Sequence, residues 1–214
     1  MSTYVNPGDV KSGLGIADGV VSELASFWTV KPGHTEQLRE ATARFAQHLQ
    51  NMTVEDSMKT SLRDSRHVIF DNGTRLLWCT TFEADWDPYF DDALLVVSPE
   101  PFLDWLGHTV EGEKALDWYR ESGGADFFSL PKDDPRFIEG ALEVSGSLKA
   151  IIQSAQSPAT GYFNLMSHHF GLTQSQIKRN MELRGALDEV LEHPEAEQAL
   201  AQPALAPLRP YAAE

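Results

Sequence analysis

The chain has only one cysteine among its 214 residues. Cys79 therefore cannot form an internal disulfide or belong to a multi-cysteine metal site, and its neighbours LLWCTTF predict a small buried side chain in a strand. Long apolar runs are also missing, since none approaches the roughly 18 residues that span a bilayer. The opening MSTYVNPGDVKSG lacks the basic and then apolar layout of a signal peptide. We therefore expect a cytoplasmic protein with no membrane partner.

Basic residues are scarce. The chain has 17 Lys and Arg against 32 Asp and Glu, a formal net charge of −15, which argues against a nucleic-acid partner. The spacings His-x-x-x-His and His-Glu-x-x-His do not occur, so no preformed metal site is expected. Gly-x-Ser-x-Gly, a phosphate-binding loop and a dinucleotide fingerprint are missing too, which argues against a hydrolase, a kinase and a nicotinamide-dependent dehydrogenase.

The distribution of breakers and apolar residues divides the chain into three parts. Residues 1–20 contain Pro7 and four glycines and are expected to form a flexible arm. Residues 21–192 carry the periodic apolar pattern of a single α+β domain. Residues 193–214 are rich in Ala and Pro and are expected to form a tail that is unstructured or lies against a partner.

Local patterns predict the elements of that domain. VVSELASFWTV reads as a first strand, followed by a helix capped by Thr35. RHVIF and RLLWCTTF read as a hairpin, because Asn72-Gly73 between them accepts positive φ. Helical patterns follow over 101–156, and GYFNLMSHHFG, residues 161–171, reads as the last strand before a helix capped at Thr173. The result is a ferredoxin-like antiparallel four-stranded sheet covered by helices, with an extra C-terminal helix.

Four aspartates fall within the segment DWDPYFDDALL and its flank, at the start of a predicted helix. Such a cluster suggests a metal site. Asp87 as an N-cap before Pro88, with the other carboxylates on a solvated face, accounts for the same residues. Helix initiation is the interpretation we adopt.

Three stretches carry a family resemblance: VKPGHTEQLREA, TRLLWCTTFEADWDPYFDDAL and GYFNLMSHHFGLTQSQIKRNMELRGALDEVL. Together they make residues 21–191 similar to a bacterial family of ferredoxin-like, dimeric α+β barrel domains. These domains occur alone and fused to catalase-like or peroxidase-type haem proteins. The resemblance implies a homodimer, with a ligand pocket between one sheet face and the helices. Relatives carry a histidine where this chain has Arg63, a few residues before an arginine that corresponds to Arg66.

Side chains on a strand alternate between its faces, so the predicted last strand places Asn164, Met166 and His168 together. His168 and His169 then point to opposite faces and cannot grip one metal ion. Pairing of the last strand with the first would bring this set near either Ser26 and Trp28 or Phe27 and Thr29, and the third strand would add Trp78 and Thr80. His168 would be a general base or, if haem binds, its axial ligand. The alternative is a hydrogen-bonded polar residue at a strand end. The predicted substrate-binding residues are Asn164, Trp28, Trp78, Arg66 and Met166.

The resemblance and the apolar, sparsely polar last strand lead to one functional hypothesis. The protein is expected to be an oxidoreductase of the oxygenase or peroxidase type, either cofactor-free or haem-assisted, acting on a hydrophobic or aromatic small molecule. The alternative is a non-catalytic ligand-binding or assembly module that partners a haem or biosynthetic enzyme. Arg63 in place of the family's histidine and the Ala/Pro tail favour that alternative.

Overall fold

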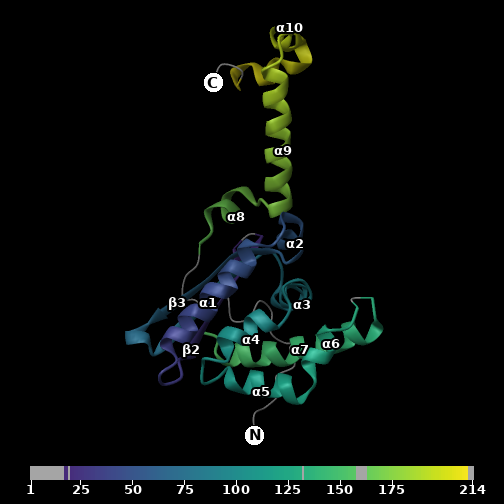
Figure 1. Cartoon of the computed structure of the whole chain (residues 1–214). Helices are drawn as coiled ribbons and strands as arrows, with labels where there is room; N and C mark the ends of the chain where they lie inside the picture. The colour runs from purple at the N-terminus through teal and green to yellow at the C-terminus, as the bar shows by residue number, and fades with distance from the viewer. Residues whose placement is uncertain (1–16, 19, 132, 158–162, 212–214) are drawn as a thin grey trace. The chain divides into compact units, whose positions relative to one another are not determined.

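The computed structural model describes residues 17–18, 20–131, 133–157 and 163–211. The chain divides into two compact units, Met1–Gly171 and Leu172–Glu214. The first unit is α+β, with helices packed on an antiparallel sheet (Figure 1). In the described part of the chain, no helix is both long enough and apolar enough to cross a bilayer.

The sheet has three long strands: β2 (Val21–Thr29), β3 (Leu62–Phe70) and β4 (Arg75–Phe82). A two-residue strand, β1 (Ala17–Asp18), is attached to the start of β2, and the strand order is β1-β2-β4-β3. All pairings are antiparallel, and β4 lies in the centre, with Leu24 opposite Thr80 and His67 opposite Trp78. β3 is therefore an edge strand.

The predicted hairpin at Asn72-Gly73 is confirmed. A short 3₁₀ turn, η2 (Asp71–Gly73), joins β3 to β4. Its three residues all have positive φ, of 51°, 54° and 85°. Asp, Asn and Gly are the residue types that tolerate the left-handed region best, and this is why the turn forms here.

Among the described residues up to Ser154, seven helices accompany the sheet: α1 (Thr35–Gln50), α2 (Val54–Lys59), α3 (Trp86–Val97), α4 (Glu100–Leu106), α5 (Glu113–Glu121), α6 (Gly124–Phe128) and α7 (Pro135–Ser154). α1 crosses from β2 to β3 and contacts both β3 and α4 (Figure 1). The prediction that Thr35 caps α1 is wrong, because His34 occupies that position. The Thr35 hydroxyl instead donates to the Gly73 carbonyl at 3.1 Å.

The core lies between the helices and one face of the sheet. β4 alternates strictly, with Leu76, Trp78, Thr80 and Phe82 buried and the residues between them half-buried. Trp105 of α4 contacts Trp28 and Trp78, with ring centroids 5.4 and 5.5 Å apart. Tilted and edge-on aromatic contacts of this kind are favourable beyond the burial of area alone.

The predicted four-stranded ferredoxin-like sheet is wrong in its last strand. Leu165–Phe170 forms the short helix α8, and Gly161 and Tyr162 lie outside the described residues. The stretch contains aromatic residues but no Val, Ile or Thr. Its Leu and Met favour a helix, which Gly171 follows with a positive φ of 57°. The expected barrel type of sheet is therefore not formed.

A shorter segment takes the expected place beside the first strand. The Phe27 amide donates to the Ala155 carbonyl at 2.7 Å, and the Ser157 amide donates to the Ala25 carbonyl at 3.1 Å. The chain leaving α7 thus pairs with the middle of β2 through one antiparallel bridge, Ser26 to Gln156.

The second unit contains α9 (Gln174–Leu191), α10 (Ala196–Leu200) and the 3₁₀ segment η3 (Pro203–Tyr211). The predicted cap at Thr173 is confirmed, and it forms a full capping box with Gln176. Neither α9 nor α10 has a buried residue among those that the structure describes.

Candidate functional site

Alternation along β3 selects the residue at the centre of the candidate site. Asp64 and Arg66 are exposed, whereas Ser65, His67 and Ile69 are half-buried on the face toward the helices. His67 therefore points to the opposite face of β3 from Arg66. His67 enters the region between β3 and α1.

Aromatic rings enclose the imidazole of His67. It stacks on Trp78 with an interplanar angle of 12° and a centroid distance of 6.2 Å. Phe45 and Trp105 contact it edge-on at 5.3 and 4.9 Å. Its Nε2 is buried and has no hydrogen-bond partner among the described residues. A buried polar atom without a partner is costly, so Nε2 is a candidate for contact with a bound ligand. Nε1 of Trp105, beside the same ring, is also without a partner among the described residues.

Burial lowers the pKa of His67 from its ordinary value of 6.5 to about 3. A cation in this aromatic surrounding would lose its hydration without gaining a counter-charge. His67 is therefore a neutral imidazole near pH 7. It can donate or accept a hydrogen bond, whereas a pKa so low makes it a poor general base.

A pocket with a volume of about 410 Å³ lies between α1 and β3, beside His67. This size falls within the range typical of small-molecule sites. Its lining residues from α1 are Arg39, Thr42, Ala43, Phe45, Ala46 and Leu49, and those from β3 are Ser65, Arg66, His67 and Ile69.

The structure brings some of the predicted site residues to this pocket. Arg66 is among its lining residues, although its side chain lies on the opposite face of β3 from His67. Trp78 lies beneath the pocket, stacked on His67 and donating from Nε1 to the Ser65 hydroxyl at 3.1 Å. Trp28 is fully buried in the same core and is linked to His67 through Trp105, which contacts both.

The other predicted residues lie around α8. His168 and Met166 are exposed and Asn164 is half-buried. The His168 ring contacts Phe163 and His169, with centroids 5.3 and 5.0 Å apart. Since the segment is helical, the argument that places the two histidines on opposite strand faces does not hold. Within the described residues, no group of three or more His, Cys, Asp or Glu is arranged to hold a metal ion.

The aspartates at the start of α3 have a different role. Asp87 and Asp91 form ion pairs with the ammonium group of Lys149, at 3.1 and 2.8 Å, and Ser145 hydrogen-bonds to Asp91. Lys149 is buried on α7. The lysine thus supplies the cation, and the carboxylates join α3 to α7. The predicted cap at Asp87 is wrong by two residues, since Asp85 precedes α3.

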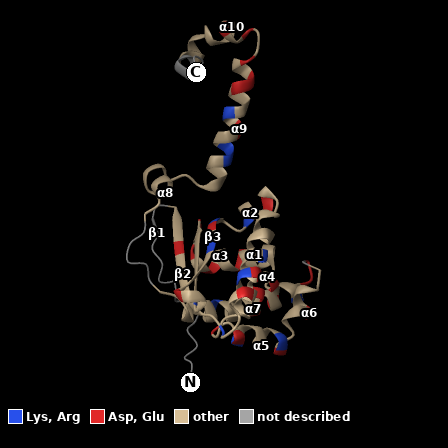
Figure 2. Cartoon of the chain, turned by 60° about the vertical axis from the view of Figure 1, so that its left-hand side comes forward, with Lys and Arg blue, Asp and Glu red and all other residues tan. Residues whose placement is uncertain are grey.

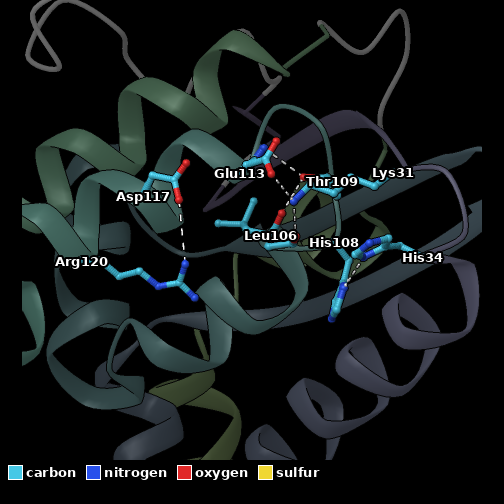
Figure 3. A network of polar contacts seen from close by, with 10 residues as sticks. Lys31, His34, Leu106, His108, Thr109, Glu113, Asp117 and Arg120 are labelled. Atoms are coloured by element: carbon cyan, nitrogen blue, oxygen red, sulfur yellow. Dashed lines mark hydrogen bonds and ion pairs between the residues drawn. The ribbon is translucent and has the colours of Figure 1, made fainter.

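A second histidine pair lies at the end of β2 (Figure 3). Nδ1 of His34 and Nδ1 of His108 are 3.0 Å apart. Burial, and then the proximity of His34, lower the pKa of His108. Lys31 lies alongside and donates to the Gly107 carbonyl and to Glu113, each at 2.9 Å. These bonds join the β2–α1 turn to the α4–α5 connection.

Haem does not fit His67 as its axial ligand. Such a ligand holds the wide porphyrin plane directly against its nitrogen. Nε2 of His67 is enclosed, with the rings of Phe45, Trp78 and Trp105 around it. We derive no chemistry through haem at this site.

His67 was missed as a site residue because its isolation depends on contacts distant in sequence. The alternation in SRHVIF shows which face it occupies. Phe45 and Trp105 come from helices that begin 32 residues before it and 33 after it, at Thr35 and Glu100, and no local pattern places both rings over it. Comparison of the chain with models of known families, with curated proteins and with solved structures gives no match.

Proposed function

We propose that the protein binds a small hydrophobic or aromatic molecule in the pocket between α1 and β3. The observation that carries this proposal is the buried, unpartnered Nε2 of the half-buried His67 beside a pocket of about 410 Å³. Phe45, Leu49 and Ile69 supply apolar wall. The imidazole also lines the pocket and supplies one polar contact.

The oxidation expected from the sequence remains part of this proposal, restricted to reactions that do not need haem on His67. Oxidation of an aromatic ligand, as the family resemblance implies, would have to proceed at this pocket without haem bound to His67. Neutral His67 would orient a hydroxyl or carbonyl group of the ligand by hydrogen bonding. His168 keeps its predicted role only if α8 contributes to a site.

Occlusion of the pocket tests the binding proposal. The probe is N-phenyl-1-naphthylamine, a neutral aromatic molecule whose fluorescence rises in apolar sites. Ala46 is an exposed helical alanine that lines the pocket, so Ala46→Trp fills it and should abolish binding. Ala186 is an exposed alanine on α9, and Ala186→Trp is the matched control, which should leave binding unchanged. Equal affinity in all three proteins would reject the proposal.

A homodimer is proposed through the open face of the sheet. Val68 and Phe70 are 43% and 37% exposed there, and Phe27 packs edge-on against Phe70 at 6.5 Å. Asp64 and Arg66 lie on the same face of β3, so a copy related by two-fold symmetry offers each charge an opposite one. Val68→Lys should convert a dimer into a monomer in light scattering after size exclusion. A wild-type protein that is monomeric at high concentration would refute the dimer.

An assembly role, with cytoplasmic residence, is the second candidate. α9 is a well-capped helix of 18 residues, yet it buries none of its described side chains. Met181 and Leu183 are 69% and 67% exposed. Such a helix suits a protein partner, with the Ala/Pro tail beside it. Loss of a captured partner on deletion of residues 194–214 would support this role, and retention would exclude the tail as the contact.

A further inference from the structure

Two half-buried histidines outside the α1/β3 pocket face each other at the end of β2 (Figure 3). His34 lies in the turn between β2 and α1, and His108 follows α4. Their ring centroids are 5.3 Å apart with an interplanar angle of 50°, and their two Nδ1 atoms are 3.0 Å apart. The rings are therefore not stacked, and they approach each other through nitrogen atoms.

The distance between the two Nδ1 atoms fits two ligands of one metal ion. An imidazole nitrogen lies about 2.0–2.1 Å from a bound transition metal, so two such nitrogens are about 2.9 Å apart at a right angle and about 3.3–3.4 Å apart at a tetrahedral angle. The observed 3.0 Å is close to the right-angled value. Nitrogen ligands at right angles are typical of Cu²⁺ and Ni²⁺, and Cu²⁺ binds nitrogen sites most strongly among the divalent ions.

Metal binding needs only a change of tautomer within the pair. In the hydrogen bond between the rings, one Nδ1 donates a proton and the other accepts it, since a neutral imidazole has one donor and one acceptor nitrogen. When the donating ring carries its proton on Nε2 instead, both Nδ1 atoms offer a lone pair to a cation. Both rings remain neutral, so no net proton is taken up or released.

The surroundings of the pair suit a cation. His108 lines a pocket of about 430 Å³ between α4 and α5, so this member of the pair can be reached from a cavity. The two basic side chains near His108 already have acidic partners, Lys31 with Glu113 at 2.9 Å and Arg44 with Asp104 at 2.8 Å. The charged residues of α4 itself are acidic (Figure 2), and the whole chain has a net charge of −15. This balance of charge favours a cation over an anion.

We propose that His34 and His108 bind, through their Nδ1 atoms, a divalent transition-metal ion that takes ligands at right angles, such as Cu²⁺. Within the part of the chain that the structure describes, no third His, Cys, Asp or Glu completes the ligand set. Water therefore fills the other coordination positions, and the ion is exchangeable, unlike the closed four-ligand sites of structural zinc. The ion connects the β2–α1 turn to the α4–α5 connection. This inference is independent of ligand binding between α1 and β3.

Calorimetric titration of the full chain with Cu²⁺, in a buffer that does not bind copper, tests the proposal. The test variants are His34→Asn and His108→Asn, because an amide keeps a hydrogen-bonding group beside the partner ring but is a poor ligand for Cu²⁺. His48 is exposed on α1, so His48→Asn controls for the loss of any one histidine. His168→Asn/His169→Asn controls for the adjacent histidines of α8.

The loss of a ligand should have a large effect, since loss of an outer-shell partner alone weakens metal binding about 10- to 100-fold. We expect His34→Asn and His108→Asn each to weaken the tightest Cu²⁺ site at least about tenfold, and both controls to bind as the wild type does. Electron paramagnetic resonance of wild-type protein with one equivalent of Cu²⁺ should show coupling to two imidazole nitrogens. Unchanged affinity in His34→Asn, loss of the site only in the α8 variant, or a wild-type spectrum without this coupling would overturn the proposal.

Discussion

At the residue scale, the surroundings of His67 determine its protonation state and leave one ring nitrogen without a hydrogen-bond partner among the described residues. Its ring is held by Trp78, Phe45 and Trp105, and these contacts favour the neutral imidazole. The same packing leaves Nε2 without a protein partner. A site that stabilises the neutral ring must lose stability when the ring is protonated, and this gives the first prediction.

The stability of the first unit should fall in mild acid because of His67. Its pKa is about 3 in the folded state against 6.5 ordinarily, so the unfolded chain binds the proton more readily. The contribution of the neutral ring is complete above about pH 6.5 and is lost as the pH falls toward 3. The expected slope is about 1.4 kcal/mol per pH unit. Urea unfolding between pH 7 and 4 measures it.

His67→Phe is the matched control, since phenylalanine keeps a ring of similar size without a titratable nitrogen. The difference in unfolding free energy between wild type and variant isolates the histidine from the many carboxylates. A constant difference across this pH range would contradict the assignment of a neutral His67 with a buried Nε2.

The surroundings of Lys149 determine how much unfolding free energy its substitution should cost. Lys149 is 4% exposed and paired with Asp87 and Asp91. Lys149→Met leaves two partly buried carboxylates without their cation and should cost about 2–3 kcal/mol in urea unfolding. Lys178→Met, in an exposed pair with Glu182, should cost less than about 0.5 kcal/mol. Equal losses of unfolding free energy in the two variants would show that the buried ion pairs of Lys149 contribute no more than an exposed pair.

At the element scale, the hairpin between β3 and β4 is held by a close approach to α1. Gly73 has φ of +85°, and a Cβ there would lie 2.7 Å from Cγ2 of Thr35. Gly73→Ala should destabilise the protein by about 1–2 kcal/mol from backbone strain, with the clash adding to it.

A double-mutant cycle separates strain from clash. Thr35→Ser removes the methyl group and keeps the hydroxyl that donates to the Gly73 carbonyl. Gly73→Ala should therefore cost less in the Thr35→Ser background than in wild type, as measured by thermal or urea unfolding. Equal costs in both backgrounds would mean that the turn moves away from α1 instead of clashing with it.

The elements also show how far the sequence alone reaches. Asn72-Gly73 determines its turn through local chemistry, and the alternation of β4 and the cap at Thr173 are equally local. The stretch around His168 was misassigned because aromatic residues suit both strands and helices, and the absence of Val, Ile and Thr was the missed signal. The His67 pocket needed α1 and α4 placed in space, which no local pattern provides.

At the scale of the whole molecule, the core belongs to one unit. Among the described residues, the main hydrophobic cluster extends from Leu24 to Ala155. α9 and α10 bury no described residue. Since burial of apolar area is the main source of stability, a chain ending at Gly171 should melt within a few degrees of the full chain in calorimetry. A large drop would show that the second unit stabilises the first.

The most direct test of the central claim is the ¹⁵N spectrum of the His67 imidazole at pH 7, recorded with and without N-phenyl-1-naphthylamine. We predict the nitrogen shifts of a neutral ring in the free protein, and a change in those shifts on binding, because the pocket brings the ligand against this side chain. A protonated ring at pH 7, or shifts that stay fixed while the ligand binds, would contradict the account.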